Sequence, residues 1–460
     1  MVLSVFLALG LYHLDYRSMW VDEGLTLNNI AGLSRHDLFR PLYFLFVRLW
    51  TVGGKSIFYL RLSSVLFGLG SLTFLFLIGL RLKNLELALI SSLLYALSSY
   101  HLERAQEIRM YTMFSFLALA EMYLFMLLRE RFSWKKFVVY WVISFLCLAT
   151  DPLGAFLNLF QNFSLIINHR KQRQFLKNTI LVEAGLIILS IPWILKIWGF
   201  SVYFQGKWIK HIKIPSLLDP TGLPGSIGRS MILVTEYGKE IDKLSFLIGM
   251  LILVSLLYNA FIWLRRKEEA RGFIALWYLI PVLAMLTAGI FNFKLIFCRY
   301  LFFLAPAAYL NLSFFLSAFR PSFKYLGYAL LIVVSIFLLS QYYRYPGEQD
   351  WKGAALFLAK EKKTERRILI YPKYATSIVR YYYPEASLEG VRANEDFTND
   401  GALGNFLAPY LENKQETWIV FLTTSEGAQE IIHYLKGRHL AANEQTFQKV
   451  VLIKLKMNSL

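Results

Sequence analysis

The chain has 460 residues, carries 49 Lys and Arg against 31 Asp and Glu for a net charge of +18, and is 56% hydrophobic. Only 17% of its residues are charged, whereas soluble globular chains have about 25%. This composition excludes a disordered polycation, argues against a soluble enzyme or a nucleic-acid-binding chain, and leaves an integral membrane protein. Cys147 and Cys298 are too few for a disulfide scaffold or a Cys-rich metal site.

About eleven apolar runs bounded by charged residues approach the roughly 20 residues that a membrane-spanning helix needs. The first run has no basic residue before it and no small-residue cleavage site after it, which argues against a signal peptide. We therefore predict an α-helical polytopic membrane protein. In chain order the runs are Val2 to Leu14, Ile57 to Leu80, Leu85 to Tyr100, Tyr111 to Leu128, Phe137 to Thr150, Leu153 to Ile167, Thr179 to Trp198, Leu244 to Leu264, Phe273 to Phe291, Tyr300 to Phe319 and Leu326 to Tyr343.

The short loops between these runs alternate in their content of Lys and Arg. Cytoplasmic loops are the cation-rich ones in membrane proteins, so the alternation predicts a cytoplasmic N-terminus and an extracytoplasmic C-terminus. The cation-poor loops hold Arg104, Arg109, Lys294 and Arg299. The cation-rich loops hold Arg81, Lys83, Arg129, Arg131, Lys135, Lys136, Arg170, Lys171, Arg173, Lys177, Arg265, Arg266, Lys267, Arg271, Arg320 and Lys324.

Three longer segments then fall on the outer side of the membrane. They are the loops over residues 15–56 and 199–243 and the polar tail over residues 344–460. Short apolar strands alternate with amphipathic helices in the tail, which predicts a small α/β domain. We expect a membrane domain over residues 1–343, which includes both loops, followed by an extracytoplasmic domain over residues 344–460.

Two features of the first outer loop could carry chemistry. Asp22 and Glu23 are adjacent, and a carboxylate held at the membrane surface can act as a general base. Solvated loops carry such pairs as well, so the pair alone does not decide. Further along, Pro41 begins an aromatic amphipathic run to Trp50, which favours a helix lying in the membrane interface. Arg40, directly before it, is suited to bidentate binding of a phosphate.

Charged residues also crowd the short second outer loop, from His101 to Tyr111. Glu103, Glu107 and Tyr111 are spaced four apart, so a helix would place Glu107 and Tyr111 on one face. The alternative is a salt-bridged helix end, which does not explain the like charges of Glu103 and Glu107.

Five motifs follow one another along the chain. They are Asp-Glu after the first run, Pro-Leu-Tyr at the interfacial segment, Arg-Leu-Ser-Ser-Val-Leu-Phe-Gly at Arg61 to Gly68, Gln-Glu-Ile-Arg-Met-Tyr at Gln106 to Tyr111, and Arg-Tyr-Leu at Arg299 to Leu301. In this order they resemble the GT-C glycosyltransferases of the protein O-mannosyltransferase and lipid A aminoarabinose transferase type, often labelled family 39. The tail, with its motifs at Asp350 to Ala355 and Arg380 to Pro384, resembles the outer domain of many bacterial members.

This resemblance implies a GT-C fold of about eleven helices in the plasma membrane of a bacterium. It also implies inverting transfer of a sugar from a polyprenyl phosphate to a hydroxyl acceptor of the cell envelope, on the outer face. Asp22 matches the family's catalytic carboxylate, Glu23 is its usual neighbour, and Glu107 lies where a second acidic site is expected, so these three are the candidate catalytic residues. The remaining candidates are the phosphate-binding Arg40, Arg109 and Arg299 and the accessory residues Tyr43, Tyr111 and Asp151.

The resemblance leaves two points open. Many bacterial members have Thr-His-Tyr where this chain has Thr150-Asp151-Pro152, so the identity of the acceptor is not implied. The scheme requires no metal, and the seven histidines have no ligand spacing. Because related oligosaccharyl transferases hold a divalent ion between acidic loops, an ion between Asp22 and Glu107 is the alternative. The expected partners are the lipid-linked donor, the hydroxyl acceptor and membrane lipids, and no nucleic acid.

Two other functions stay as alternatives. A flippase or transporter of lipid-linked sugars places functional charges inside its spans, and Glu121 and Glu183 are such residues unless they make interhelical polar contacts. A glycan polymerase or ligase would share the donor but take a longer acceptor. A large outer loop rich in Arg and His would favour it, and the loop over residues 199–243 is only moderately basic.

Overall fold

The computed structural model describes residues 1–31, 40–167, 173–185, 195, 223–231, 239–290, 298–344, 347, 349–361, 366–391, 400–411, 416–425 and 427–456. The chain forms two compact units. The helical unit consists of Met1–Leu14 and Ser34–Arg344, and the α/β unit consists of Asp15–Leu33 and Tyr345–Leu460.

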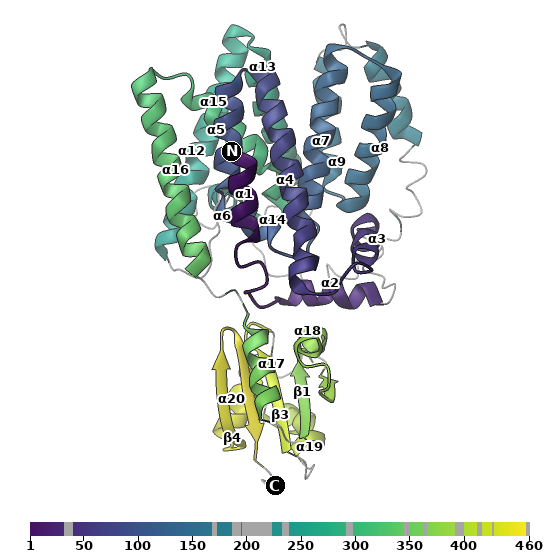
Figure 1. The fold of residues 1–460 in the computed structure, drawn as a ribbon, viewed down its shortest axis with the longest axis vertical. Helices are drawn as coiled ribbons and strands as arrows, with labels where there is room; N and C mark the ends of the chain where they lie inside the picture. The colour runs from purple at the N-terminus through teal and green to yellow at the C-terminus, as the bar shows by residue number, and fades with distance from the viewer. Residues whose placement is uncertain are drawn as a thin grey trace. The chain divides into compact units, whose positions relative to one another are not determined.

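The helical unit is built from helices of very different length. Besides a helical segment over residues 173–185, its described elements are α1 (Val2–Leu11), α3 (Pro41–Trp50), α4 (Ile57–Leu82), α5 (Leu85–Ala96), α6 (Ser99–Ala105), α7 (Tyr111–Glu130), α8 (Trp134–Thr150), α9 (Gly154–Ile167), α11 (Leu223–Arg229), α12 (Lys239–Arg266), α13 (Glu269–Ile290), α14 (Cys298–Leu301), η2 (Phe302–Leu304), α15 (Ala305–Leu316) and α16 (Pro321–Arg344) (Figure 1).

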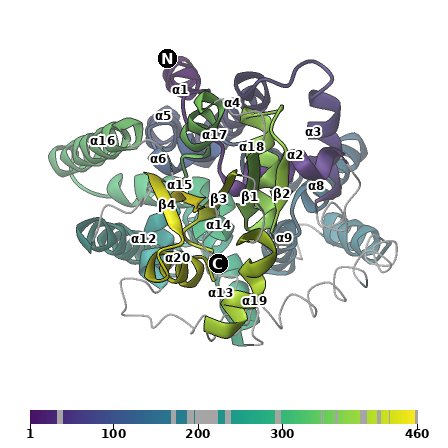
Figure 2. The ribbon, with the colours of Figure 1, turned by 90° about the horizontal axis from the view of Figure 1, so that it is seen from below.

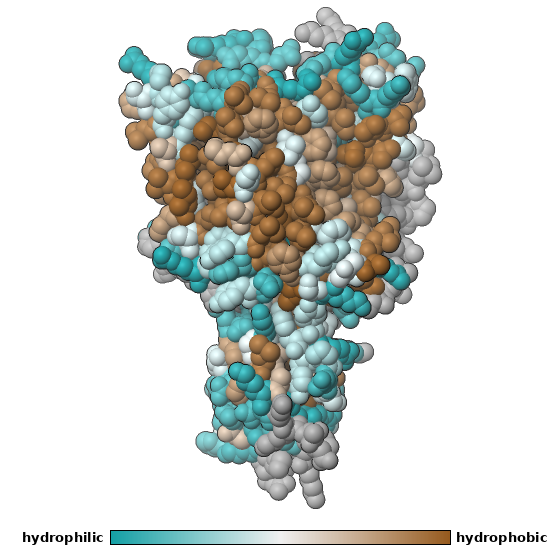
Figure 3. All heavy atoms as spheres, in the orientation of Figure 1, coloured by the Kyte–Doolittle hydropathy of each residue, from teal (hydrophilic) through white to brown (hydrophobic). Residues whose placement is uncertain are grey.

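Six of the described helices are long and apolar enough to cross a membrane, namely α4, α7, α12, α13, α16 and the segment Arg299–Leu316 that contains η2 and α15. If α5 and α6, bent by 65°, cross together, they form a seventh span. Apolar side chains form a broad band over these helices on the face seen in Figure 3. The predicted polytopic helical fold is therefore confirmed. The predicted run from Thr179 to Trp198 and the loop over residues 199–243 lie largely outside the described residues.

Cation-rich loops meet at one end of the helical unit. Lys83, after α4, donates from Nζ to Ser317 Oγ at the end of α15 over 2.6 Å. Arg129 Nη2, at the end of α7, lies 4.0 Å from Glu269 Oε2 at the start of α13. These contacts join loops that the alternation of charge assigned to one side of the membrane, and Figure 1 shows the α4–α5, α7–α8 and α12–α13 connections at the same end. Which side of the membrane this end faces stays a prediction.

Glycines allow α11 and α12 to pack backbone against backbone. A Cβ atom added at Gly249 would lie 1.8 Å from the carbonyl oxygen of Pro224, and one added at Gly228 would lie 1.7 Å from that of Ser245. Real Cβ atoms do not approach so closely, because the chain is already packed at van der Waals distance. Any side chain at these two positions must therefore separate the helices.

The α/β unit contains one mixed sheet with helices on both faces. Its elements are α2 (Val21–Ala31), α17 (Trp351–Lys360), β1 (Arg366–Tyr371), η3 (Lys373–Ala375), α18 (Thr376–Tyr382), β2 (Leu388–Gly390), α19 (Asp400–Leu411), β3 (Glu416–Leu422), α20 (Ala428–Gly437), β4 (Ala441–Phe447) and β5 (Val450–Leu455). The strand order is β2-β1-β3-β5-β4, in which β2, β1 and β3 are parallel and β5 is antiparallel to its neighbours β3 and β4. The view in Figure 2 shows α17 and α18 on one face of the sheet and α19 and α20 on the other.

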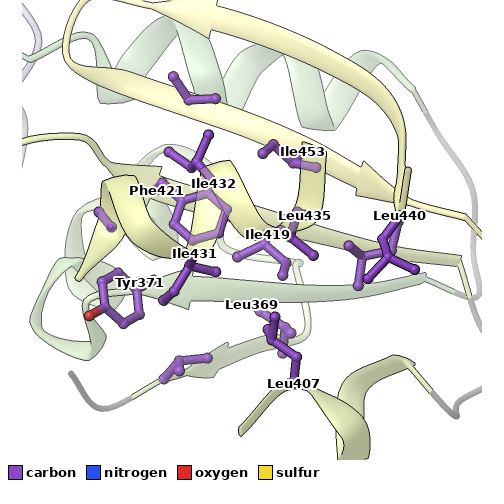
Figure 4. Close-up of a cluster of buried hydrophobic side chains, with 14 of the residues drawn as sticks. Leu369, Tyr371, Leu407, Ile419, Phe421, Ile431, Ile432, Leu435, Leu440 and Ile453 are labelled. Carbon is purple, nitrogen blue, oxygen red and sulfur yellow. The ribbon is translucent and has the colours of Figure 1, made fainter. Parts of the chain in front are cut away.

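Alternate residues of the strands point to opposite faces and build two apolar layers. Leu369, Ile419 and Phe421 pack against Leu407 of α19 and Ile431 of α20 in one buried cluster (Figure 4). On the other face Phe357 of α17 stacks edge-on against Trp418, with ring centroids 5.8 Å apart. The small α/β domain predicted for the tail is confirmed.

Residues 15–33 belong to the α/β unit rather than to the spans beside which they stand in the sequence. Their helix α2 packs against α18 and η3, and Ser377 Oγ donates to Gly24 O over 3.1 Å. The domain boundary predicted at residues 343/344 is not tested by this grouping, but the helix that carries Asp22 and Glu23 clusters with the C-terminal part of the chain.

Candidate functional site

The acidic pair occupies the first turn of α2, where its two members differ in environment. Glu23 is fully buried, and its Oε2 accepts a hydrogen bond from Trp20 N at 3.3 Å. This is the return half of a capping box, in which a carboxylate at the third helical position satisfies an amide just before the helix. Asp22 is only partly buried, and its carbonyl oxygen accepts from Thr26 Oγ1 at 2.9 Å. Glu23 therefore stabilises the start of the helix, and Asp22 is the more accessible carboxylate.

Residues of the C-terminal segment fix the backbone directly before Asp22. Val21 N donates to Gln349 Oε1 at 3.0 Å, and Met19 N donates to Tyr382 OH at 2.9 Å. The indole Nε1 of Trp351 donates to the same Gln349 oxygen at 2.8 Å. Because Val21 begins α2, its amide would otherwise lack a partner within the helix.

In the helical unit, Arg40 forms an ion pair with Asp151. Arg40 Nε donates to Asp151 Oδ2 over 2.7 Å, and the two side chains are 24% and 5% exposed. Burial lowers the pKa of the Arg40 guanidinium, but the charge and hydrogen bond of Asp151 outweigh it, so the pKa lies above its ordinary value. Asp151 Oδ1 also accepts from Leu153 N at 3.1 Å, which fixes the turn after α8.

The pair uses only one of the three nitrogens of Arg40. No other hydrogen bond of this side chain is found within the described ranges, so both Nη groups can still donate to a ligand. A planar guanidinium with two such groups matches the spacing of phosphate oxygens. The structure thus assigns Asp151, predicted as an accessory residue, to the fixation of Arg40.

Two tyrosines accompany this ion pair. Tyr111 at the start of α7 and Tyr300 of α14 both lie within electrostatic range of Arg40, and Tyr300 lies within range of Arg299 and Asp151 as well. We call Arg40, Asp151, Tyr111, Tyr300 and Arg299 the Arg40 cluster. It draws its members from the starts of α3 and α7, the end of α8, and α14, which are far apart in the sequence.

Other predicted residues surround Tyr111. The guanidinium carbon of Arg109 is 6.0 Å from the centroid of its ring, and that of Arg104 is 5.3 Å away. Tyr43 is buried on α3 with its ring edge-on to Phe44. Arg109 and Tyr43 therefore lie in the same unit as the Arg40 cluster, and Arg109 adjoins it through Tyr111.

Glu107 takes part in a buried ion-pair network. Arg104 Nη1 donates to Glu107 Oε2 over 2.8 Å, and Arg104 also pairs with Glu103. All three side chains are less than 10% exposed, and Arg104 lies 4.8 Å from the centroid of the Tyr100 ring. One guanidinium thus neutralises the two like-charged carboxylates that the sequence left unexplained. A catalytic role of Glu107 stays a prediction.

Solved structures of two proteins have folds similar to that of this chain. ArnT from Cupriavidus metallidurans in the apo state has a TM-score of 0.59 at 13% identity, and the match covers 98% of this chain and 97% of that chain. The same protein bound to undecaprenyl phosphate also has a TM-score of 0.59, at 11% identity, and covers 100% and 98%. The Archaeoglobus fulgidus oligosaccharyltransferase AglB, solved with an inhibitory peptide and a dolichol-phosphate, gives 0.53 at 10% identity and covers 96% and 72%.

This chain has the GT-C fold. The resemblance predicted from the five motifs is confirmed in this respect, and the chain is a multi-pass membrane protein like ArnT. No protein-family model and no curated protein sequence matches it.

Several polar residues of this GT-C chain were not singled out from the sequence. Gln106 Nε2 donates to Gly10 O and Tyr12 O over 3.0 and 2.9 Å, and Tyr342 OH donates to Gln106 Oε1 over 2.6 Å. Arg61 Nη1 donates to Leu14 O over 3.0 Å. These buried side chains bind the carbonyl groups that α1 and the following turn leave without helical partners. Arg61 and Gln106 lie in two of the five motifs, and this was the feature of the sequence that could have pointed to them.

The two acids inside the helices have polar neighbours. Glu183 Oε2 accepts from Asn162 Nδ2 over 2.6 Å, which is the interhelical contact that the sequence left as an alternative. Glu121 is fully buried among Ser144, Cys147 and Gln161. Among the described residues, no group of three or more His, Cys, Asp and Glu could hold a metal ion. Metal dependence, including an ion between Asp22 and Glu107, stays untested.

Proposed function

We propose that this protein is an inverting glycosyltransferase that moves a sugar from a polyprenyl phosphate to a hydroxyl acceptor on the outer face of the bacterial plasma membrane. The observation that carries the proposal is the Arg40 guanidinium, which Asp151 holds through Nε and whose two Nη groups make no further hydrogen bond among the described residues. Proteins of this fold have been solved with undecaprenyl phosphate and with a dolichol-phosphate, which supports a lipid phosphate as the ligand.

The residues of the Arg40 cluster would bind the phosphate that leaves. In the reaction, the acceptor oxygen forms a bond to the anomeric carbon while the bond from that carbon to the phosphate oxygen breaks. Negative charge then grows on the phosphate, and Arg40 and Arg299 would stabilise it more strongly than in the bound donor. Tyr111 and Tyr300 carry hydroxyl groups that can donate to the same oxygens.

Asp22 would remove the proton from the acceptor hydroxyl. Its carboxylate stands in the first turn of α2, is accessible and is held by a fixed backbone, whereas Glu23 is buried in its cap. Direct inversion requires the base and the leaving group on opposite sides of the anomeric carbon, without a covalent sugar-enzyme intermediate. A long lipid donor also explains why a transferase is built on many apolar helices.

The decisive experiment measures sugar transfer and donor binding on the same purified variants. Asp22→Asn removes the base but little volume, so we expect transfer to fall by about 10² to 10⁴-fold with unchanged binding of the polyprenyl-phosphate sugar. Asp15→Asn is the matched control, since Asp15 is an exposed acid of the same segment. Wild-type turnover by Asp22→Asn would exclude Asp22 as the base. Movement of the lipid across vesicles without any sugar transfer would favour the flippase instead.

The same transfer assay can identify the sugar and the acceptor. A panel of polyprenyl-phosphate pentoses and hexoses tests the donor, and lipid, glycan and peptide hydroxyl acceptors test the other substrate. Turnover that grows only with long glycan acceptors would identify a polymerase or ligase. Transfer to a small lipid or a protein hydroxyl would identify the simpler transferase.

A further inference from the structure

Three consecutive backbone amides directly before Asp22 each donate to a side chain. Met19 N donates to Tyr382 OH, Trp20 N to Glu23 Oε2, and Val21 N to Gln349 Oε1, over 2.9, 3.3 and 3.0 Å. Two of the three acceptors come from the C-terminal segment, more than 300 residues away in the sequence. The entry of the chain into α2 is therefore determined by the α/β unit and not by local sequence alone.

Gln349 binds two donors with one side-chain oxygen. Its side-chain oxygen accepts both from Val21 N and from Trp351 Nε1, and it is 8% exposed. An amide oxygen has two lone pairs, so both donors are satisfied by one atom. Trp351 is itself fully buried, and its helix α17 packs against β4 and β5. Through this shared acceptor, the first amide of α2 is tied to the rigid core of the α/β unit.

Helix α2 packs closely against α18 at Gly24. A Cβ atom added at Gly24 would lie 2.1 Å from Ile378 Cγ1, 2.8 Å from Ile378 Cδ1 and 3.3 Å from Ser377 Oγ. Nearby, Lys352 N donates to Ser18 Oγ over 3.0 Å. Hydrogen bonds to the backbone before Asp22 and the close approach of Ile378 to Gly24 after it thus restrain the turn that carries Asp22.

We propose that Gln349 is a positioning residue for Asp22, so that the α/β unit is part of the catalytic apparatus of this protein. The inference rests on the proposed function, in which Asp22 is the base. A general base must stand within hydrogen-bond reach of the proton that it removes. A displacement of about 1 Å can cost about 10²-fold in rate. Gln349 acts on the rate only through the place of Asp22 and does not touch the substrate.

The first test compares two substitutions of Gln349. Gln349→Leu removes the acceptor and leaves two buried N–H groups without it, whereas Gln349→Glu keeps an oxygen that can accept from both. We expect Gln349→Leu to lower kcat by at least about tenfold with unchanged donor affinity, and Gln349→Glu to restore most of the rate. Equal rates of the Leu and Glu variants would overturn the proposal. So would a loss in donor affinity without a loss in kcat, because it would place Gln349 in substrate binding.

The second test uses the contact between the helices. Gly24→Ala strengthens the intrinsic helix propensity by about 1 kcal/mol, so a weaker helix cannot explain a loss of rate. We expect this variant to lose transfer and Gly24→Ala combined with Ile378→Ala to recover it, because the second change removes the two Ile378 atoms that would lie within 3.0 Å of the new methyl group. Ile378→Ala alone is the control. Full activity of Gly24→Ala, or no recovery in the double variant, would contradict the proposal.

Thermal unfolding of each variant shows whether it folds. If Gln349→Leu or Gly24→Ala is less stable, the comparison with Gln349→Glu and with the Gly24→Ala and Ile378→Ala double variant still tests the proposal, because these variants should recover the rate. The failure of the inference and of the proposed function are distinguishable. Absence of sugar transfer by the wild-type protein refutes both. Transfer that Asp22→Asn abolishes but Gln349→Leu retains refutes the inference alone.

Discussion

Replacing Arg40 tests the proposed phosphate-binding site at its central residue. Two charge-assisted hydrogen bonds from the Nη groups to a phosphate contribute about 1.5–3 kcal/mol each in a partly buried site, of which part is offset by water at a side chain that is 24% exposed. We expect Arg40→Ala to weaken binding of a polyprenyl phosphate by about 2–3 kcal/mol, which is about 30 to 150-fold in Kd. Arg40→Lys keeps the charge but not the fork and should recover part of this loss.

Replacing Asp151 should change phosphate binding in opposite directions with and without Arg40. At an effective dielectric constant of about 20, opposite charges about 4 Å apart attract by about 4 kcal/mol, and desolvation offsets much of this, so loss of the pair should cost the fold about 1–2 kcal/mol. Asp151→Asn alone releases Arg40 and should weaken binding moderately. In the Arg40→Ala background the carboxylate only repels the phosphate, so the added Asp151→Asn should strengthen binding.

The assay is equilibrium binding of a polyprenyl phosphate to purified protein in lipid nanodiscs, with the uncharged polyprenol as the probe for apolar contacts. Arg48→Ala is the matched control, since Arg48 is an exposed cation on the same helix α3. Polyprenol should bind all variants alike. The reasoning is refuted if Arg40→Ala binds the phosphate as tightly as Arg48→Ala does.

Two further predictions concern stability. Arg104→Met should leave two buried carboxylates, Glu103 and Glu107, without a counter-charge and lower the free energy of unfolding by about 3–5 kcal/mol. Thermal unfolding in detergent would test this, with Arg320→Met as the control because Arg320 is exposed. Equal melting temperatures of the two variants would contradict the ion-pair network. Gly249→Ala should force α12 away from Pro224 and reduce the melting temperature. Gly185→Ala is the control and should not reduce it, because no atom lies within 4 Å of the new methyl group. Equal melting temperatures of the two variants would show that α11 and α12 can separate without cost.

Much of the fold could be predicted because the length of an apolar run and the periodicity of its residues are local properties of the sequence. The runs that begin at Ile57, Tyr111 and Leu326 became α4, α7 and α16, and the apolar strands of the tail became β1, β3 and β5. The short β2 and the polar β4 were not predicted. Leu388–Gly390 is only three residues long, and Ala441–Phe447 is an edge strand with too few apolar residues for a recognisable pattern.

The candidate site was only partly predictable. Asp22 and Arg40 were singled out from the sequence because a carboxylate at the membrane surface can act as a base and an arginine can bind a phosphate. The partners that fix them were not, since Asp151 is 111 residues from Arg40 and Gln349 is 328 residues from Val21. For Glu23, the sequence could not show its burial or its hydrogen bond with Trp20 N, which make it a helix cap. A catalytic role of Glu23 stays a prediction.

The sequence by itself determined that the chain is a helical membrane protein with an α/β tail and which acid and arginine to examine first. These follow from composition, from the length of apolar runs and from short motifs, each of which acts through neighbouring residues. Only the tertiary structure decided that α2 is held by the C-terminal segment, that Asp151 fixes Arg40 and that Arg104 neutralises two carboxylates. Such contacts join side chains from distant segments, and no local pattern encodes them because their energy exists only once the helices and the sheet have packed.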